Sequence, residues 1–113
     1  MTMPLTRSFR ETVADRAKAS PGFRAALVEE AMQALADGDV ETARTLLRDV
    51  ANATLGFQAL AQETGIPEKS LMRMLGPNGN PSLLNLGSIV RALNKHVGVR
   101  VTARAELADA AAP

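Results

Sequence analysis

The sequence predicts an all-α protein, a bundle of five to six helices followed by a short C-terminal β-strand. Three observations predict this class. Residues 57–76 read as two short helices joined by a glycine turn. Residues 40–54 and 83–97 carry apolar side chains at spacings of three and four, the period of a helix with one buried face. Only residues 97–104 alternate with period two, as a strand does.

Length and composition indicate one small globular domain with looser ends. The chain has 113 residues, a formal net charge of +1 and no cysteine, so it needs no oxidising compartment. No apolar stretch approaches the roughly 20 residues that span a bilayer, and the first ten residues lack the apolar core of a signal peptide. We therefore expect a soluble cytoplasmic protein.

We divide the chain into an N-terminal helical extension at residues 1–38, a helix-turn-helix domain at residues 39–97, and a strand with a flexible tail at residues 98–113. The extension is expected to contain a helix at residues 5–19. A second helix begins after Ser20, which can cap it, and ends at Gly38. Its apolar stripe consists of Leu27, Ala31, Ala34 and Leu35.

The third helix is expected to begin after Asp39, a suitable N-cap, and to end before Gly56. Its core-facing stripe consists of Val40, Ala43, Leu47, Val50 and Thr54.

Residues 57–76 carry the strongest functional signal, because they have the layout of a DNA-binding helix-turn-helix. We expect helices at residues 57–64 and 67–75, where a small residue lets the helices approach and a glycine takes the left-handed conformation of a tight turn. The predicted packing positions are Leu60, Ala61, Gly65, Ile66, Leu71 and Met74.

The outward positions of the second motif helix are polar and able to bond bases and phosphates. They are Glu68, Lys69, Ser70 and Arg73. Arg73 suits a bidentate pair with guanine, and Lys69 lies one turn away on the same face. A plain helical bundle with a solvated charged face would give a similar pattern.

The flanks of the motif offer further donors. Gln58, near the start of the first motif helix, can point its amide toward a phosphate. Residues 76–81 contain two prolines and two glycines and must form a turn, in which Asn78 and Asn80 can reach the sugar-phosphate backbone. An exposed glutamine and an ordinary Asn-Gly turn are the plain alternatives.

Ser82 is placed to cap the last helix, which has the most apolar stripe in the chain. The stripe consists of Leu83, Leu86, Ile89, Val90, Leu93 and Val97. We expect this helix at the centre of the core.

The predicted strand has no partner in the rest of the chain, so its backbone hydrogen bonds would be unmade. It is expected to pair with a second copy of the chain or with a partner protein. The residues proposed for this contact are Val97, Val99, Arg100, Val101 and Ala103.

Charge is distributed unevenly along the chain. Residues 65–104 hold six basic residues against one glutamate, a balance of +5, whereas residues 38–64 hold two basic against four acidic residues, a balance of −2. The net charge of +1 by itself argues against strong nucleic-acid binding, but the distribution matters more than the sum. Such asymmetry can give a nearly neutral protein one basic face.

An enzyme is not expected. His96 is the only histidine, and neither cysteine nor tyrosine is present. Glu29 and Glu30 are adjacent and splay apart on a helix, and Met72 and Met74 are interpreted as packing residues. No cofactor and no metal site are predicted.

The chain resembles the helix-turn-helix antitoxins of the lambda-repressor-like class, the addiction-module antidote proteins. The resemblance covers roughly residues 22–97 and is carried by ALADGDVETARTLLRDVANAT, GFQALAQETGIPEKSLMRMLGPNGNPS and LGSIVRAL. It implies a lambda-repressor-like DNA-binding domain with DNA-facing positions Gln58, Pro67, Glu68, Lys69, Ser70 and Arg73, and with Asn78 and Asn80 as backbone contacts. Residues 1–20 and the predicted strand lie outside the common core.

Members of that family act as dimers that repress their own operon and neutralise a co-encoded toxin, often a RelE-like ribosome-dependent ribonuclease. The resemblance therefore implies a sequence-specific repressor of double-stranded DNA, a homodimer, and a cognate toxin as partner. A solitary transcriptional regulator and a protein-interaction adaptor that does not bind DNA are the alternatives.

Overall fold

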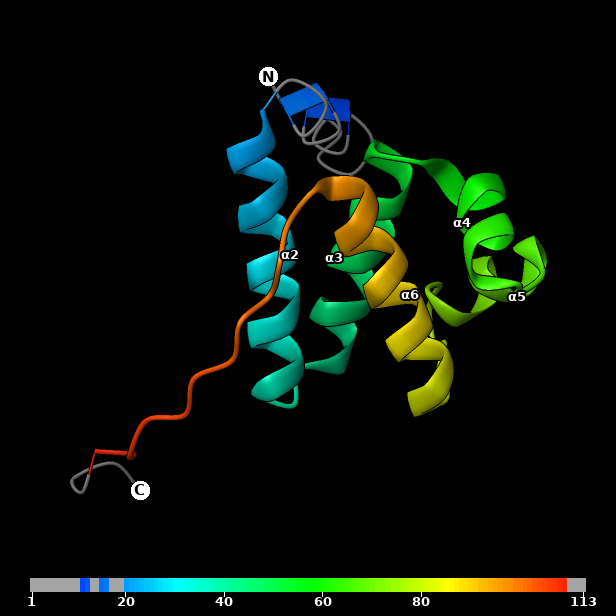
Figure 1. Ribbon diagram of the computed structural model, residues 1–113. Coiled ribbons are helices and arrows are strands. Elements are labelled where there is room, and N and C mark those ends of the chain that lie inside the picture. Colours follow the sequence, from blue (N-terminus) through cyan, green and yellow to red (C-terminus); the bar gives the residue numbers. More distant parts are fainter. Residues whose placement is uncertain (1–10, 13–14, 17–19, 110–113) are drawn as a thin grey trace, which may run out of the picture.

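The computed structural model describes residues 11–12, 15–16 and 20–109, and within them the protein is all-helical, as predicted (Figure 1). The helices are α2 (Pro21–Ala36), α3 (Val40–Ala53), α4 (Gly56–Thr64), α5 (Glu68–Met74) and α6 (Leu83–Val97). Of the helix expected at residues 5–19, the described residues 11–12 and 15–16 are helical, and the rest lie outside the description. No helix in the described ranges is both long and apolar enough to cross a membrane.

Three helices begin at the capping residues that the sequence predicts. In each, a side-chain oxygen accepts a hydrogen bond from the backbone N–H three positions later, which satisfies one unpaired donor of the first turn. The caps are Ser20, Asp39 and Ser82, at distances of 3.1, 3.2 and 3.1 Å. The bonds from Thr42 hold the pKa of the Asp39 carboxyl below its ordinary value.

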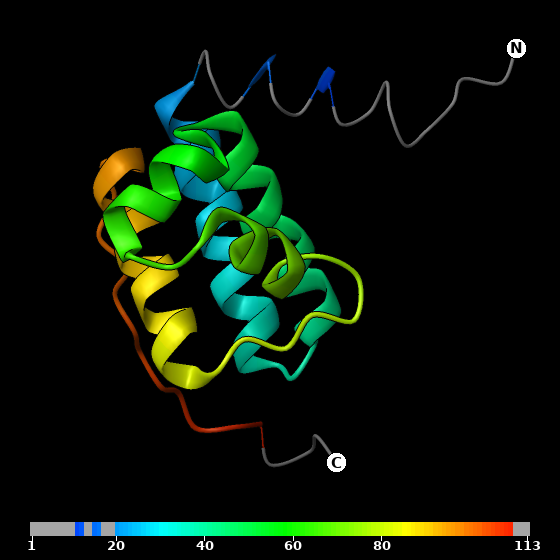
Figure 2. The same ribbon diagram turned by 90° about the vertical axis from the view of Figure 1, so that its right-hand side faces the viewer.

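The helices form one body around a shared core. α2 and α3 pack along each other, while α6 contacts α2, α3 and α4. α4 and α5 lie together on one side of the molecule, toward the viewer in Figure 2. α2, which belongs to the predicted N-terminal extension, contributes Leu27, Val28 and Ala31 to the same core cluster as α3 to α6.

The side chains that anchor this core come from every one of these helices. The largest fully buried side chains are Leu60, Leu71, Leu75, Ile89, Leu93, Val28 and Val50. Each such burial contributes about 1.5–3 kcal/mol relative to an exposed side chain. The helical spacing thus identified the core face of each helix.

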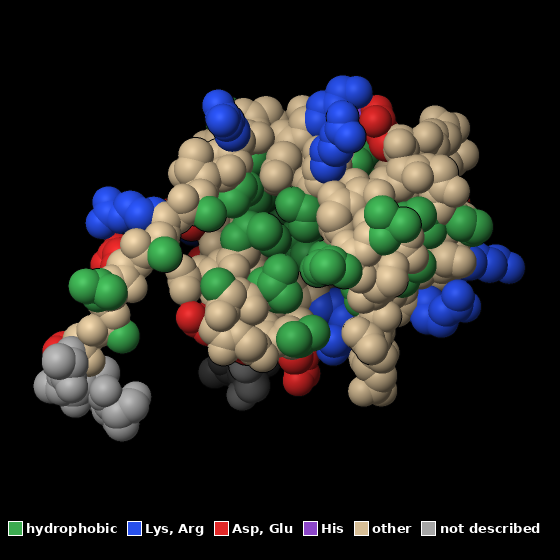
Figure 3. Space-filling model, turned by 60° about the horizontal axis from the view of Figure 1, so that its bottom comes forward, with side chains coloured by type: hydrophobic (Ala, Val, Ile, Leu, Met, Phe, Trp, Pro, Cys, Tyr) green, Lys and Arg blue, Asp and Glu red, His purple; other side chains and the backbone are tan. Residues whose placement is uncertain are grey.

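Two of the predicted stripes, those of α3 and α6, are wrong at their first positions. Val40 is 48% exposed at the start of α3, and Leu83 is 86% exposed at the start of α6, where its neighbour Leu84 is 80% exposed. These first turns lie at the lower end of the bundle in Figure 1, beyond the buried part of their helices. Figure 3, which brings that end forward, shows hydrophobic side chains gathered on the surface with Lys and Arg at its edges. Helical period alone does not tell where the neighbouring helices stop.

The predicted C-terminal strand is wrong in the described part of the chain. Val97 is the last residue of α6 and is buried. Gly98 follows in the left-handed region with φ of +79°, and its N–H and that of Val99 both donate to the carbonyl oxygen of Asn94. Gly98 therefore terminates α6 as a left-handed glycine C-cap.

Beyond that ending, residues 100–109 are exposed and irregular. The segment passes along α2 and leaves the body (Figure 1). The residues proposed as a pairing strand were Val97, Val99, Arg100, Val101 and Ala103, and of these only Val97 and Val99 pack on the core. Apolar residues at every second position indicate a segment that could pair as a strand. The strand forms only where another extended segment supplies its hydrogen bonds.

Candidate nucleic-acid interface

α4 and α5 are joined by a short turn that local hydrogen bonds stabilise. Gly65 ends α4 with φ of +75°, a conformation that glycine adopts without steric cost, and its N–H donates to the carbonyl oxygen of Ala61 at 2.9 Å. The Thr64 hydroxyl donates to the Leu60 carbonyl oxygen at 2.8 Å and accepts from the Ile66 N–H at 3.2 Å.

Pro67 then precedes α5 in an extended conformation, with φ of −56° and ψ of 142°. Its carbonyl oxygen accepts the N–H of Leu71 at 3.0 Å and so begins the helical ladder. Proline suits this extended position because its ring fixes φ near the observed value and it has no N–H to satisfy. Pro67 itself is exposed.

Buried leucines hold α5 against the rest of the protein. Leu60 of α4 and Leu71 of α5 are completely buried, and Ala61, Ile66 and Met74 pack against the same core. α4 is the helix with which α5 makes its inter-helix contacts in the described part of the chain. The orientation of α5 is therefore set mainly by α4 and by its own buried leucines.

The opposite side of α5 faces solvent. Glu68, Lys69 and Arg73 are exposed, while Ser70 is half-buried. Met72, interpreted from sequence as a packing residue, is instead 51% exposed. α5 thus presents one acidic, two basic and one large apolar side chain, a mixed set that could contact both phosphates and base edges.

The loop after α5 is folded tightly onto that helix. Gly76 is buried, and the N–H of Gly79 donates to the Gly76 carbonyl oxygen at 2.9 Å. A Cβ added at Gly79 would collide with the carbonyl oxygens of Arg73 and Met74. Only glycine allows this approach.

Two exposed asparagines flank Gly79. Asn78 has a positive φ of 62°, a conformation that asparagine tolerates better than most residues, and Asn80 follows on the other side. Both stand beside the C-terminal end of α5, where the sequence expected backbone contacts.

Arg44 fastens the same loop from α3, and the sequence did not reveal this role. Its guanidinium donates to the Gly79 carbonyl oxygen at 3.1 Å, across 35 positions of the chain. No spacing rule connects the two residues. The only sequence signal is a basic residue beside the buried Ala43 on an amphipathic helix, which is too common to be specific.

Gln58 is exposed in the first turn of α4, three residues after Leu55. The N-cap residue Leu55 makes no side-chain hydrogen bond to the backbone N–H groups in the first turn of α4. The sequence-predicted DNA-facing residues are all exposed or half-buried, and they lie on α4, on α5, at Pro67 between these helices, and in the loop after α5.

The basic residues of segment 65–104 do not gather on one surface. Lys69 and Arg73 belong to α5, whereas Arg100 and Arg104 lie in the C-terminal segment, which leaves the body on the side away from α4 and α5 (Figure 1). The +5 balance along the sequence is thus divided between separate parts of the molecule.

A cluster of ionisable side chains links α4 to α6. A carboxylate oxygen of Glu63 lies 3.1 Å from Nε2 of His96, and the other lies 3.7 Å from Nζ of Lys95. The hydrogen bond from His96 and the positive charge of Lys95 hold the pKa of Glu63 below its ordinary value.

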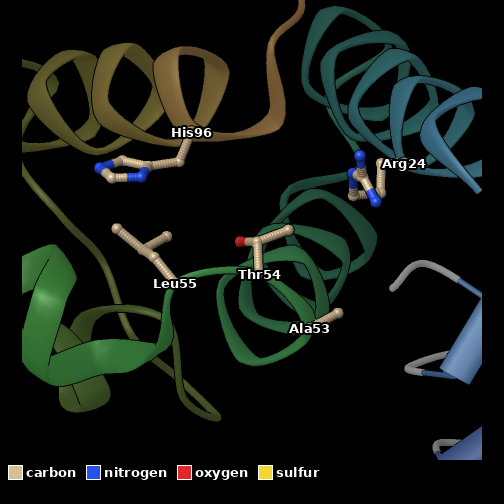
Figure 4. A pocket seen from close by; sticks show the side chains of 5 residues that line it. All are labelled: Arg24, Ala53, Thr54, Leu55 and His96. Atoms are coloured by element: carbon tan, nitrogen blue, oxygen red, sulfur yellow. The ribbon is translucent and has the colours of Figure 1, made fainter. Parts of the chain in front are cut away.

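A cavity of about 300 Å³ lies beside this cluster (Figure 4). It is lined by Arg24 of α2, His96 of α6 and the residues Ala53, Thr54 and Leu55, where α3 gives way to α4. The Thr54 hydroxyl donates to the Val50 carbonyl oxygen at 2.6 Å, so it satisfies a carbonyl group at the C-terminal end of α3. Among the described residues, no group of three His, Cys, Asp or Glu side chains could hold a metal ion.

Comparison of the chain with protein-family models, with curated proteins and with solved structures gave no match. The functional assignment therefore depends on the residues and geometry of this chain.

Proposed function

We propose that the protein is a sequence-specific DNA-binding transcriptional regulator that uses α5 as its recognition helix. The observation that carries this proposal is the two-sided character of α5. Leu71 is completely buried, while Lys69 and Arg73 stand exposed on the other side of the same seven-residue helix. A short helix that is anchored by one face and polar on the other suits insertion into the major groove.

The rest of the interface supports this use of α5. Gln58 at the start of α4, together with Asn78 and Asn80 after α5, is expected to bond the sugar-phosphate backbone and set the register. Pro67, Glu68 and half-buried Ser70 complete the predicted contact set around Lys69 and Arg73.

We further propose that the regulator acts as a homodimer of lambda-repressor-like domains. One short recognition helix reads only a few base pairs, so useful specificity needs two copies about one helical turn, roughly 34 Å, apart. The family resemblance extends this proposal to an antitoxin that represses its own operon and neutralises a RelE-like toxin. Co-elution with the product of the adjacent gene, and relief of its toxicity, would test that extension.

The decisive experiment measures affinity for a duplex selected from a randomised library, for the wild type and for Arg73→Ala. Loss of a base contact costs about 1–3 kcal/mol, which corresponds to a roughly 5- to 150-fold weaker Kd. Arg100→Ala is the matched control, because it removes the same charge from the exposed C-terminal segment.

Binding should also weaken steeply as salt rises, because phosphate contacts release counterions. Equal Kd values for the wild type, Arg73→Ala and Arg73→Glu would remove α5 from the interface.

A protein-interaction adaptor is the second candidate, and one observation favours it. Leu83 and Leu84 expose most of their surface at the start of α6, where an apolar pair suits a protein contact better than a DNA contact. An adaptor would select no duplex from the library at any salt concentration.

A further inference from the structure

Met72 is the one large apolar side chain that α5 exposes. It is 51% exposed, while Leu71 beside it is completely buried and Met74 packs partly against the core. Leu71 already fills the core-facing side of α5, so packing in the core does not account for the position of Met72. Burial of this side chain against an apolar group of a binding partner would gain free energy.

Helical geometry places Met72 among the proposed DNA contacts. It lies three positions after Lys69 and four after Glu68, spacings that put side chains on the same helix face, and it directly precedes Arg73. Any surface that receives Lys69 and Arg73 must therefore also receive Met72.

The major groove offers one apolar group on a base edge, the methyl group at C5 of a pyrimidine. Thymine carries it in every A·T pair, and cytosine carries it only when methylated. The side chain of methionine is unbranched and adaptable, so it can follow a methyl group without demanding one rigid geometry.

We propose that Met72 is a specificity-determining residue that reads the C5-methyl group of a pyrimidine, thymine in the ordinary operator, next to the base contacted by Arg73. This inference rests on the proposed DNA-binding function and deepens it. It predicts that each half-site contains a thymine whose methyl group, rather than its hydrogen-bonding edge, is recognised.

The test uses the selected duplex, with each thymine replaced in turn by deoxyuridine, which lacks only the methyl group. For the wild type, one replacement in each half-site should weaken Kd about 3- to 10-fold. For Met72→Gln, which keeps the length of the side chain and removes its apolar end, the same replacement should leave Kd unchanged. Leu107→Gln is the control, because Leu107 is exposed in the C-terminal segment and its variant should keep the full sensitivity to deoxyuridine.

A second arm distinguishes the two sources of the methyl group. Replacing the sensitive T·A pair by C·G should weaken binding, and 5-methylcytosine at that position should recover about 3-fold or more of the loss for the wild type but not for Met72→Gln. Recovery beyond the affinity of the thymine duplex would show that methylated cytosine is the preferred base and would overturn the choice of thymine.

The outcomes separate this inference from the function beneath it. Selection of a duplex with Arg73-dependent binding but no Met72-dependent methyl effect would overturn the role of Met72 alone. Failure to select any duplex would overturn the proposed function together with this inference.

Discussion

The α4–α5 region and the C-terminal segment 98–109 both carry an apolar pattern that predicts regular structure, yet only the first forms it. In α4 and α5 the backbone hydrogen bonds are made within each helix, and Leu60 and Leu71 then find the core. In segment 98–109 the apolar residues alternate, but the described chain offers no neighbouring extended segment. The difference teaches that a helix needs a buried face, whereas a strand also needs a partner.

The largest expected effect contrasts a buried leucine of the first region with an exposed one of the second. Leu71→Ala should lower the free energy of unfolding by about 2–5 kcal/mol, because it leaves a cavity in the core. Leu107→Ala should change it by less than about 0.5 kcal/mol, since Leu107 is 100% exposed. Urea unfolding followed by circular dichroism measures both. A loss at Leu107 as large as that at Leu71 would show that the C-terminal segment is folded onto the body.

An intermediate effect is expected in the loop that completes the first region. Gly79→Ala should destabilise the protein by about 1–3 kcal/mol, because the added Cβ meets the carbonyl oxygens of Arg73 and Met74. Gly87→Ala is the matched control, since Gly87 lies in the interior of α6 and a Cβ there meets nothing within 4 Å beyond its chain neighbours and the nearby backbone of its own helix. It should stabilise the helix by about 0.5–1 kcal/mol. In thermal unfolding, Tm should thus fall for Gly79→Ala and rise for Gly87→Ala, relative to the wild type.

The smallest expected effect concerns acid stability and compares two exposed ion pairs. The lowered pKa of Glu63 means that its ionised form stabilises the folded state at neutral pH, and that this contribution is lost as pH falls below about 4.5. The Tm of the wild type should therefore exceed that of Glu63→Gln at pH 7, and this difference should shrink toward pH 3. Glu106→Gln breaks the ion pair with Arg104 inside the C-terminal segment and should leave Tm unchanged throughout. A Tm difference at Glu63 that stays constant with pH would contradict the role of its charge.

Much of the fold could be predicted from local chemistry, whereas less of the candidate site could be. Ser20, Asp39 and Ser82 could be recognised as caps because a cap and its donor lie three residues apart. The outward position of Arg73 follows from helical period alone. The bond between Arg44 and Gly79 could not be predicted, because it depends on how α3 meets the loop across 35 positions.

The sequence by itself determined the five described helices, the side-chain caps of α2, α3 and α6, and the glycine in the turn between α4 and α5, since these features depend on neighbours within about four residues. Only the tertiary structure decided which apolar side chains remain exposed, as Met72 and Leu83 do. It also decided that the basic residues are divided between separate parts of the molecule, and that segment 98–109 has no described strand partner. These outcomes depend on which surfaces meet in space, and periodicity along one segment carries no information about its distant neighbours.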